Sequence, residues 1–290
     1  LEKTRRRGGI KNVSLFITVI LFVGLFAAGS VRYDRFLSLS TFLNLFNDNA
    51  YLIIVSVGIT FVLLTGGIDI SVASTLAFTC VFSAFLLRLG VPAFVVIPLV
   101  LLIGLGVGAL MGFLIHSYDL QPFIVTLAGQ FFMRGLCAVI STESIPISDG
   151  FYKSMALGKV AFGKAKLPRR MLIERREAAL SALVARLAVA LMKKRDAMEL
   201  AVVALAYYVL KYTKFGRGVY AVGGGEQSAV LMGLPVARTK ISVYAISGFC
   251  AALAGVVFSF YTLAGYSLQN MGLELDAISS AVIGGTLLTG

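Results

Sequence analysis

Long apolar stretches separated by short polar loops make up most of the chain. A helix needs about 20 apolar residues to cross the hydrocarbon core of a bilayer, and no stretch shows the strict alternation of a membrane β-barrel strand. The pattern therefore predicts an all-α, polytopic integral membrane protein with about eight transmembrane helices. These helices are expected at residues 12–29, 49–66, 71–88, 92–115, 122–140, 198–210 with some upstream extension, 239–262 and 276–290.

The composition supports membrane insertion. Hydrophobic residues make up 58% of the chain, charged residues make up 14%, and the mean hydropathy is +0.91. A soluble protein of this size could not bury so much apolar surface. The net charge of +12 is typical of Lys and Arg gathered in cytoplasmic loops, so no nucleic-acid partner is expected. Cys80, Cys137 and Cys250 lie in apolar runs without metal-ligand spacing, so no metal site is expected.

The positions of Lys and Arg predict the orientation of the helices. Five basic residues and one acidic residue precede the first apolar run, which places the N-terminus in the cytoplasm. Loops 116–121 and 211–240 then fall inside, and loops 30–48, 141–170 and 263–275 fall outside. Loop 141–170 is basic and so departs from the rule, which long loops obey weakly.

Segment 168–199 differs from its surroundings because it is dense in charge and alanine. Its apolar centre, residues 178–192, is short for a membrane span and contains Arg186. We favour a single crossing between loops 141–170 and 211–240, and two interpretations of the segment remain open: an amphipathic surface helix or a foreign insert. Residues 1–290 are treated as one transmembrane domain, and further C-terminal residues are expected because the chain stops inside an apolar run.

The stretch "TGGIDIS" interrupts an apolar run near its centre. Adjacent glycines weaken a helix, and an intramembrane carboxylate is costly unless it is hydrated or paired. Open backbone at membrane depth is tolerated only where it lines a cavity or is buried in protein. The stretch therefore predicts a break between two helices near a water-filled path, with Gly66, Gly67, Asp69 and Ser71 lining it. The alternative is a plain turn at a membrane face, with Asp69 capping the following helix.

A second candidate is "PFIVTLAGQFFMRGL", residues 122–136, in which Pro122 fits a helix start. Thr126, Gln130 and Arg134 are spaced four apart and share one face of an otherwise apolar helix. That polar stripe is the arrangement expected of a pore wall. Alternatively, Arg134 extends its guanidinium to the membrane surface or binds another protein group.

A third candidate lies in the basic loop 211–240, in "YAVGGGEQSAVLMGLP". The chain contains no G-x-x-x-x-G-K-[ST] motif, so the glycines are not interpreted as a phosphate-binding loop and no nucleotide cofactor is expected. The pattern predicts instead a short cytoplasmic helix bounded by glycines, suited to docking a partner. Its candidate residues are Gly223, Gly225, Glu226, Ser228, Ala229 and Gly233. An ordinary connecting loop is the alternative.

Small residues at helical spacing predict close helix packing. "GLGVGALMG" places Gly104, Gly108 and Gly112 on one face, and Gly248 and Ala252 repeat the pattern in a later span. Such faces let two membrane helices approach closely.

Taken together, "VGITFVLLTGGIDISVAS", "PFIVTLAGQFFMRG" and "FGRGVYAVGGGEQSAVLMGLPVARTK…ELDAISSAVIGGTLLTG" resemble the permease subunit of ribose-type bacterial ABC sugar importers. The resemblance covers about residues 45–165 and 200–290. Within that family, "STESIPI", "YTLAGYSL" and "GTLLTG" are most similar to the galactofuranose permease. "GGIDIS" and "GGTLLT" also share a pattern that would fit a transporter built from repeated halves.

The resemblance implies a permease of about ten helices, paired with a second permease subunit in the bacterial inner membrane. It further implies cytoplasmic ABC ATPase subunits that bind and hydrolyse ATP, and a periplasmic sugar-binding protein that delivers the substrate. By position, residues Gly225 to Gly233 would form the helix that contacts the ATPase, and the Gly66–Ser71 break would belong to the translocation region. No covalent chemistry is expected of this chain. A gradient-driven secondary sugar transporter is the alternative.

Overall fold

The computed structural model describes residues 13–33, 36, 39–157 and 194–287, and helices account for most of them. The helices are α1 (Val13–Arg32), α2 (Leu39–Leu63), α3 (Val72–Arg88), α4 (Ala93–Ser117), α5 (Pro122–Ile140), α6 (Gly150–Leu157), α8 (Lys194–Tyr212), α9 (Lys214–Gly224), α10 (Glu226–Leu231), α11 (Val236–Thr262) and α12 (Leu273–Ile283). Strands β1 (Ile145–Pro146) and β2 (Ala264–Gly265) pair antiparallel, with Ile145 opposite Gly265.

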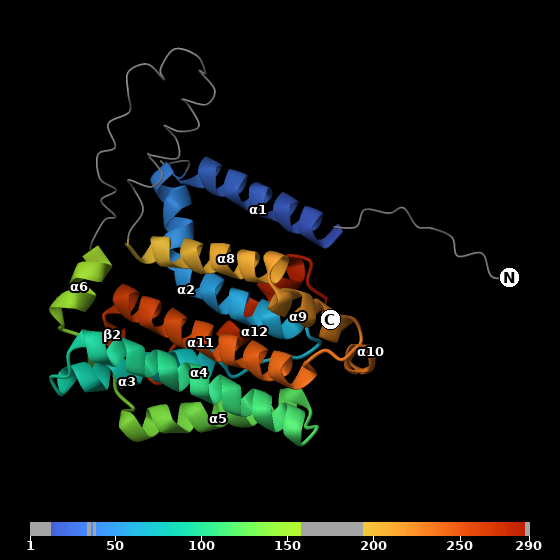
Figure 1. The fold of residues 1–290 in the computed structure, drawn as a ribbon. Coiled ribbons are helices and arrows are strands. Elements are labelled where there is room, and N and C mark those ends of the chain that lie inside the picture. Colours follow the sequence, from blue (N-terminus) through green and yellow to red (C-terminus); the bar gives the residue numbers. More distant parts are fainter. Residues whose placement is uncertain (1–12, 34–35, 37–38, 158–193, 288–290) are drawn as a thin grey trace, which may run out of the picture.

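The long helices lie side by side, with short elements gathered at the two ends of the bundle (Figure 1). Helices α9 and α10 lie at one end, which we call the α10 end. Helix α6 and the β1–β2 pair lie at the other, which we call the β1–β2 end. Successive connections fall at alternating ends, as the predicted in-and-out order of the loops requires. Helix α8 runs from the β1–β2 end to the α10 end, and the predicted single crossing also concerns residues 158–193, which lie outside the described part of the chain.

The predicted spans correspond to helices, but several boundaries differ. Helix α5 has the predicted bounds, whereas α2 begins at Leu39 rather than near residue 49. The last residues of the unusual segment, 194–199, are the first turns of α8, and residues 168–193 lie outside the described part of the chain. Within the described residues, α4, α5 and α11 are long and apolar enough to span a membrane, and shorter apolar helices occur in α1, α2 and α3.

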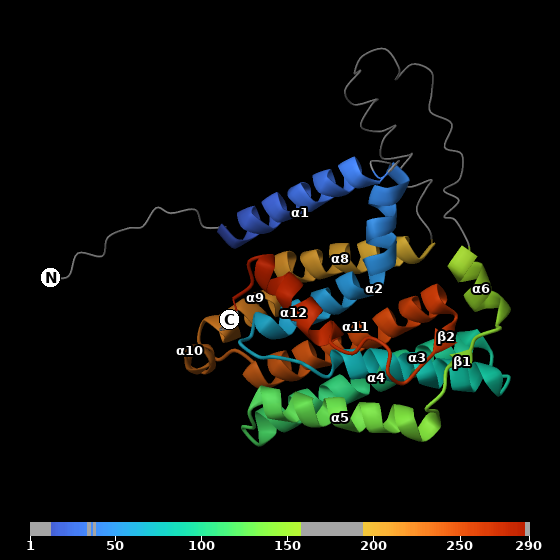
Figure 2. The ribbon, with the colours of Figure 1, turned by 180° about the vertical axis from the view of Figure 1, so that it is seen from behind.

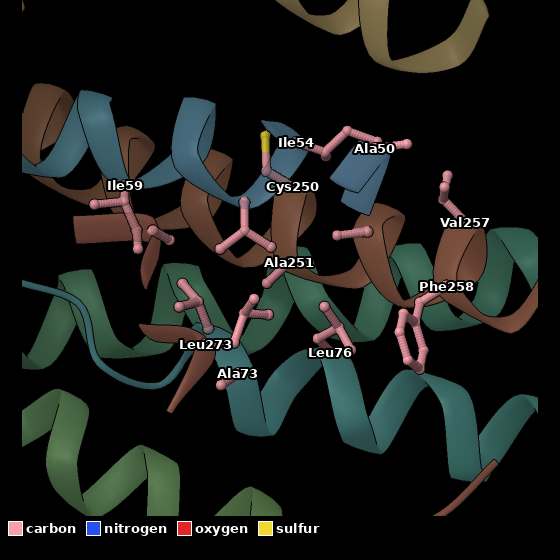
Figure 3. Close-up of a cluster of buried hydrophobic side chains, with 14 of the residues drawn as sticks. Ala50, Ile54, Ile59, Ala73, Leu76, Cys250, Ala251, Val257, Phe258 and Leu273 are labelled. Atoms are coloured by element: carbon pink, nitrogen blue, oxygen red, sulfur yellow. The ribbon is translucent and has the colours of Figure 1, made fainter. Parts of the chain in front are cut away.

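Helix α11 lies at the centre of the bundle. In its most apolar window 67% of the residues are buried, against 28% for α4 and 22% for α5, whose outer faces are suited to contact lipid. Helices α2, α3 and α4 pack around α11, and α12 lies against α2 (Figure 2). Figure 3 shows the largest core cluster, in which Ile54, Leu76 and Ala251 meet from α2, α3 and α11.

The glycine faces allow α4 to approach α11 at backbone contact. A β-carbon added to Gly108 would overlap the main chain of Tyr244, and one added to Gly248 would overlap the carbonyl oxygen of Gly104. At Gly112 an added β-carbon would lie 2.9 Å from the Ile241 Cα atom. The predicted small-residue packing is therefore confirmed, and α4 and α11 form the most extensive helix pair in the described structure.

Candidate translocation and coupling sites

The "TGGIDIS" stretch is a break between two helices, as its sequence predicts. Helix α2 ends at Leu63, and Gly66 adopts a left-handed conformation with φ of +74°. The Gly66 and Gly67 amides donate to the carbonyl oxygens of Leu63 and Val62, at 2.9 and 3.1 Å. Residues 67–70 are non-helical, and α3 begins at Val72. Glycine makes this turn possible because side chains disfavour positive φ.

Most of the break is buried in protein, although Gly66 at its start is exposed. Gly67, Asp69, Ile70 and Ser71 are all buried. The non-helical backbone of these residues is therefore surrounded by protein. Membrane proteins allow such backbone in two environments, buried in protein or lining a water-filled cavity. The burial of Asp69 and Ser71 distinguishes the break from a fully exposed turn.

Asp69 connects the break to the central helix. Its Oδ1 atom accepts from the Ser71 amide at 3.0 Å and the Ser71 hydroxyl at 2.6 Å, while Oδ2 accepts from the Ser247 hydroxyl of α11 at 2.7 Å. Asp69 is fully buried, and Ser71, not Asp69, is the N-cap residue of α3. These hydrogen bonds offset the cost of burying the carboxyl group.

The polar stripe of α5 faces inward, and its side chains bond to other segments of the bundle. The Thr126 hydroxyl lies 3.3 Å from the Ile68 carbonyl oxygen within the break and also donates within α5. The Gln130 amide donates to Glu274 Oε1 of α12 at 3.2 Å. Thus Thr126 contacts the break directly, whereas Gln130 contacts helix α12.

Arg134 binds main-chain oxygens between β2 and α12. Its Nη1 atom donates to the carbonyl oxygens of Ser267 and Gln269, at 2.6 and 3.1 Å. Arg134 therefore has a protein partner, which is one of the alternatives to a pore wall. The guanidinium donates to carbonyl oxygens of this loop that are not hydrogen-bonded within a helix or a strand pair.

Replacing Arg134 with Met is expected to loosen residues 266–272, because two charge-assisted hydrogen bonds are lost. Such bonds contribute about 1.5–3 kcal/mol each, so amide hydrogen exchange in this loop should accelerate about tenfold or more. Phe131→Met, on the same helix at a side chain that is 70% exposed, is the matched control. Equal exchange in the two variants would contradict this role of Arg134.

A cleft of about 370 Å³ at the α10 end joins the candidate sites. Its walls come from the start of the break, the α4–α5 connection and the α10–α11 region. The lining residues are Thr65, Gly66, Gly67, Ile115, Asp119, Leu120, Gln121, Pro122, Glu226, Lys240 and Tyr244. Gly66 and Gly67 therefore share one cavity with Glu226, although the sequence separates them widely.

Helix α10 is a short helix between two glycines, as predicted. Gly225 is its N-cap residue, and Gly233 follows its end with φ of +72°. The Gly233 amide donates to Val230 at 2.9 Å and the Leu234 amide donates to Ala229 at 3.0 Å. This hydrogen-bond pair is a Schellman motif, which favours glycine at the position of Gly233.

The faces of α10 differ from the prediction in one respect. Ser228 is exposed, but Ala229 is buried against Val222 and Val236 and so does not face a partner. The exposed apolar side chains are instead Val230, Leu231 and Met232, and Leu231 is 88% exposed. Gly223 lies partly buried in the last turn of α9.

An ion pair ties α10 to the central helix. Glu226 Oε2 lies 2.6 Å from Lys240 Nζ of α11, and Lys240 is the less exposed of the two. Both residues of the pair line the cleft, and Lys240 lies one turn of α11 before Tyr244. A movement of α10 would therefore displace Glu226 and its partner Lys240 in the wall of the cleft.

The sequence analysis missed several residues that complete these sites. Ser247, Tyr244, Lys240 and Glu274 supply the contacts on α11 and α12. A serine in the small-residue face of residues 239–262 was the one available signal, since hydroxyl groups at such faces often bond to another helix.

The C-terminal ends of α2 and α12 have the same pattern of capping hydrogen bonds. The position of this pattern within the glycine pair differs by one residue between the two helices. Gly285 has φ of +106°, and the Gly285 and Thr286 amides donate to Val282 and Ala281, at 3.0 and 3.2 Å. This matches Gly66 and Gly67 at the end of α2. The left-handed residue is thus the first glycine of "GGIDIS" and the second of "GGTLLT", so the two helix ends align with a shift of one residue.

Comparison with known proteins decides the family. A family described as "Branched-chain amino acid transport system / permease component" matches residues 41–290. The chain belongs to this family. The permease is 42% identical to the inner membrane ABC transporter permease protein YjfF of Escherichia coli (strain K12), over 97% of this chain and 78% of the relative.

Two further relatives carry substrate names. The fructose import permease protein FruG of Bifidobacterium longum is 38% identical, over 94% of this chain and 75% of its own length. The ribose import permease protein RbsC of Haemophilus influenzae is 34% identical, over 95% of this chain and 77% of its own length. No solved structure matches the permease. The family resemblance found in the sequence is confirmed, while a particular closeness to the galactofuranose permease is not.

Proposed function

We propose that the permease is the membrane subunit of an ATP-driven importer that carries a monosaccharide across the bacterial inner membrane. Its relatives named for ribose, fructose and D-allose support a sugar substrate. A five-membered sugar ring such as galactofuranose is the finer proposal, which rests on the sequence resemblance. The observation that carries the proposal is the cleft, because it links the buried break to the exposed short helix α10.

The translocation region would include the break and the polar stripe of α5. Asp69, Ser71, Thr126, Gln130 and Arg134 place hydrogen-bonding groups along the inner faces of α3 and α5. In the described structure these groups bond to one another, to main chain, and to the side chains of Ser247 and Glu274. A helix movement could replace these internal hydrogen bonds with hydrogen bonds to sugar hydroxyl groups. Such binding would be weak and reversible, which suits a substrate that must be released again.

The coupling site would be α10, with the N-terminus and the α10 end in the cytoplasm. An ABC ATPase subunit would bind and hydrolyse ATP and dock on the exposed apolar tip formed by Val230, Leu231 and Met232. A patch of this kind outside the lipid region is suited to a protein partner. A periplasmic sugar-binding protein and a second permease subunit complete the assembly.

Uptake into proteoliposomes that contain the permease, its ATPase and its binding protein tests this proposal. Sugar should accumulate when ATP is supplied on the ATPase side, and a proton ionophore should leave accumulation unchanged while ATP is held constant. If the ionophore abolishes uptake under those conditions, the gradient-driven alternative is correct.

Replacing Gly233 with Val is expected to uncouple ATP hydrolysis from transport. Nothing lies within 4 Å of a β-carbon at Gly233, so the effect is conformational. Positive φ costs a side chain about 1–2 kcal/mol and a β-branched one more, which would displace the end of α10. Uptake per ATP hydrolysed should therefore fall about tenfold, since 1.4 kcal/mol corresponds to a factor of ten.

Gly233→Asn is the matched control, because asparagine tolerates the left-handed conformation at a helix end. It should keep coupling near the wild-type value. Equal coupling in the Val and Asn variants would show that the end of α10 plays no part in transmission.

A further inference from the structure

Three tyrosines and a lysine form an exposed cluster at the C-terminal end of α8. Tyr207, Tyr208 and Tyr212 are three of the 11 tyrosines in the chain, and all three are exposed. The Lys211 ammonium donates to the Tyr207 hydroxyl at 2.5 Å and lies 5.6 Å from the centre of the Tyr212 ring. The tyrosines therefore hold this ammonium in place at the surface of the bundle.

The exposed side chains of α8 change in a regular order along the helix. Leu200, Val203 and Leu205 are exposed first, the tyrosines follow, and Lys211 lies in the last turn. Lys211 is six residues beyond Leu205, or about 9 Å along the helix. Apolar, then aromatic, then basic side chains are the order met on passing from the hydrocarbon of a bilayer through its interface to the lipid headgroups. The order places Lys211 at the level of the headgroups.

Helix α9 adds two cations next to this cluster. A β-carbon at Gly216 would overlap the carbonyl oxygens of Val209 and Leu210, so α9 begins in close contact with the end of α8 (Figure 1). Lys214 and Arg217 of α9 are exposed and are spaced three apart, so they share its outer face. The two helices thus present three basic side chains on one part of the surface.

Carboxylates do not compensate these positive charges. Among the described residues, none of the three basic side chains has an ion-pair partner. Residues 200–225 include no Asp or Glu, and Glu226 is already paired with Lys240. An ammonium has three N–H donors, and a single hydrogen bond joins Lys211 to its tyrosine. The remaining donors and the exposed tyrosine hydroxyl groups suit the oxygens of a phosphate group.

We propose that Tyr207, Tyr208, Lys211, Tyr212 and Lys214 form a binding site for the headgroup of an anionic phospholipid in the cytoplasmic leaflet, which we call the α8 lipid site. A lipid is favoured over the ATPase because the cluster continues the exposed apolar surface of α8, along which the acyl chains would lie. Basic side chains at a membrane surface attract anionic lipids. The assignment to the cytoplasmic leaflet rests on the proposed function, which places the α10 end in the cytoplasm.

A single tryptophan tests the α8 lipid site. The chain contains no Trp, so Tyr208→Trp introduces one fluorescent reporter. The variant is reconstituted into vesicles of phosphatidylcholine and phosphatidylglycerol, in which one lipid or the other carries brominated acyl chains that quench Trp on contact. Quenching should reveal a preference for phosphatidylglycerol of about fivefold or more, since each basic residue at a membrane surface contributes roughly a factor of five. Lys211→Gln combined with Lys214→Gln should remove most of this preference.

Two matched variants serve as controls. Phe123→Trp places the reporter at an exposed position at the same end of the bundle, after a connection that carries Asp119 and no Lys or Arg. It should show no preference between the two lipids. Lys153→Gln removes an exposed cation of α6, at the β1–β2 end, and should leave the preference at position 208 unchanged.

The outcomes separate the α8 lipid site from the proposed function. The site is wrong if positions 208 and 123 show the same preference, or if the double Lys→Gln variant keeps the preference at position 208. It is also wrong if that variant loses its ATPase on co-purification while the lipid preference stays, because the cations then serve the ATPase. ATP-driven sugar uptake is measured separately in vesicles that also hold the ATPase and the binding protein. Uptake without a lipid preference overturns the site alone, and a lipid preference without uptake overturns the proposed function alone.

Discussion

Gly108→Leu is expected to separate α4 from α11 and to destabilise the whole bundle. A β-carbon at Gly108 would already overlap the main chain of Tyr244, and neither backbone can move without displacing the rest of the interface. Overpacking typically costs about 1–3 kcal/mol, and overlap with main chain lies at the top of that range or beyond it. The unfolding midpoint should fall by about 10 °C, as measured by the loss of the monodisperse peak after heating in detergent.

Gly106→Leu is the matched control for this substitution. Gly106 lies on the same helix, is exposed, and has nothing within 4 Å of an added β-carbon. The same change in composition and helix propensity should therefore leave the midpoint nearly unchanged. If both variants unfold at the same temperature, the close approach of α4 and α11 is not what stabilises the bundle.

Asp69→Ala is expected to impair transport strongly, because it removes the carboxylate that hydrogen-bonds the break to α11. The hydroxyl groups of Ser71 and Ser247 would lose their buried acceptor, at a cost of about 1–3 kcal/mol each. The sugar uptake rate should fall about tenfold or more, while the amount of permease in the membrane, measured by immunoblot, remains comparable.

Ser247→Ala tests the same connection from the other side. It removes only the bond to Oδ2, so its effect on uptake should be smaller than that of Asp69→Ala. In the double variant, the Ser247 change should add nothing to the Asp69 change, because both break one interaction. Additive losses would show that the two residues act independently, and normal uptake by Asp69→Ala would remove Asp69 from the mechanism.

Local sequence signals predicted the elements that depend on local chemistry. Pro122 at the first position of α5 and the glycine pair before Asp69 correctly placed a helix start and a helix break. The start of α2 was misplaced because the helix extends through "NLFNDN", whose polar residues are not typical of a membrane span. Strands β1 and β2 have two residues each and are too short to show a periodic pattern.

Contacts between distant segments could not be predicted in this way. The partner of Asp69 is 178 residues away, and the first partner of Arg134 is 133 residues away. Only the packing of α11 at the centre of the bundle brings these groups together. The burial of Ala229 was missed for a different reason, since the six residues of α10 are too few to show which face is buried.

Residues 64–71 form an opened, largely buried segment, and we expect its environment to change when an ATPase moves α10. Labelling of Ile68→Cys by a small hydrophilic thiol reagent tests it most directly, in the assembled transporter with ADP and with a non-hydrolysable ATP analogue. The labelling rate should differ about tenfold or more between the two nucleotides, while a cysteine at Ser154, an exposed residue of α6, should react equally in both. A cysteine at position 68 that reacts at one rate in both nucleotide states would contradict the account.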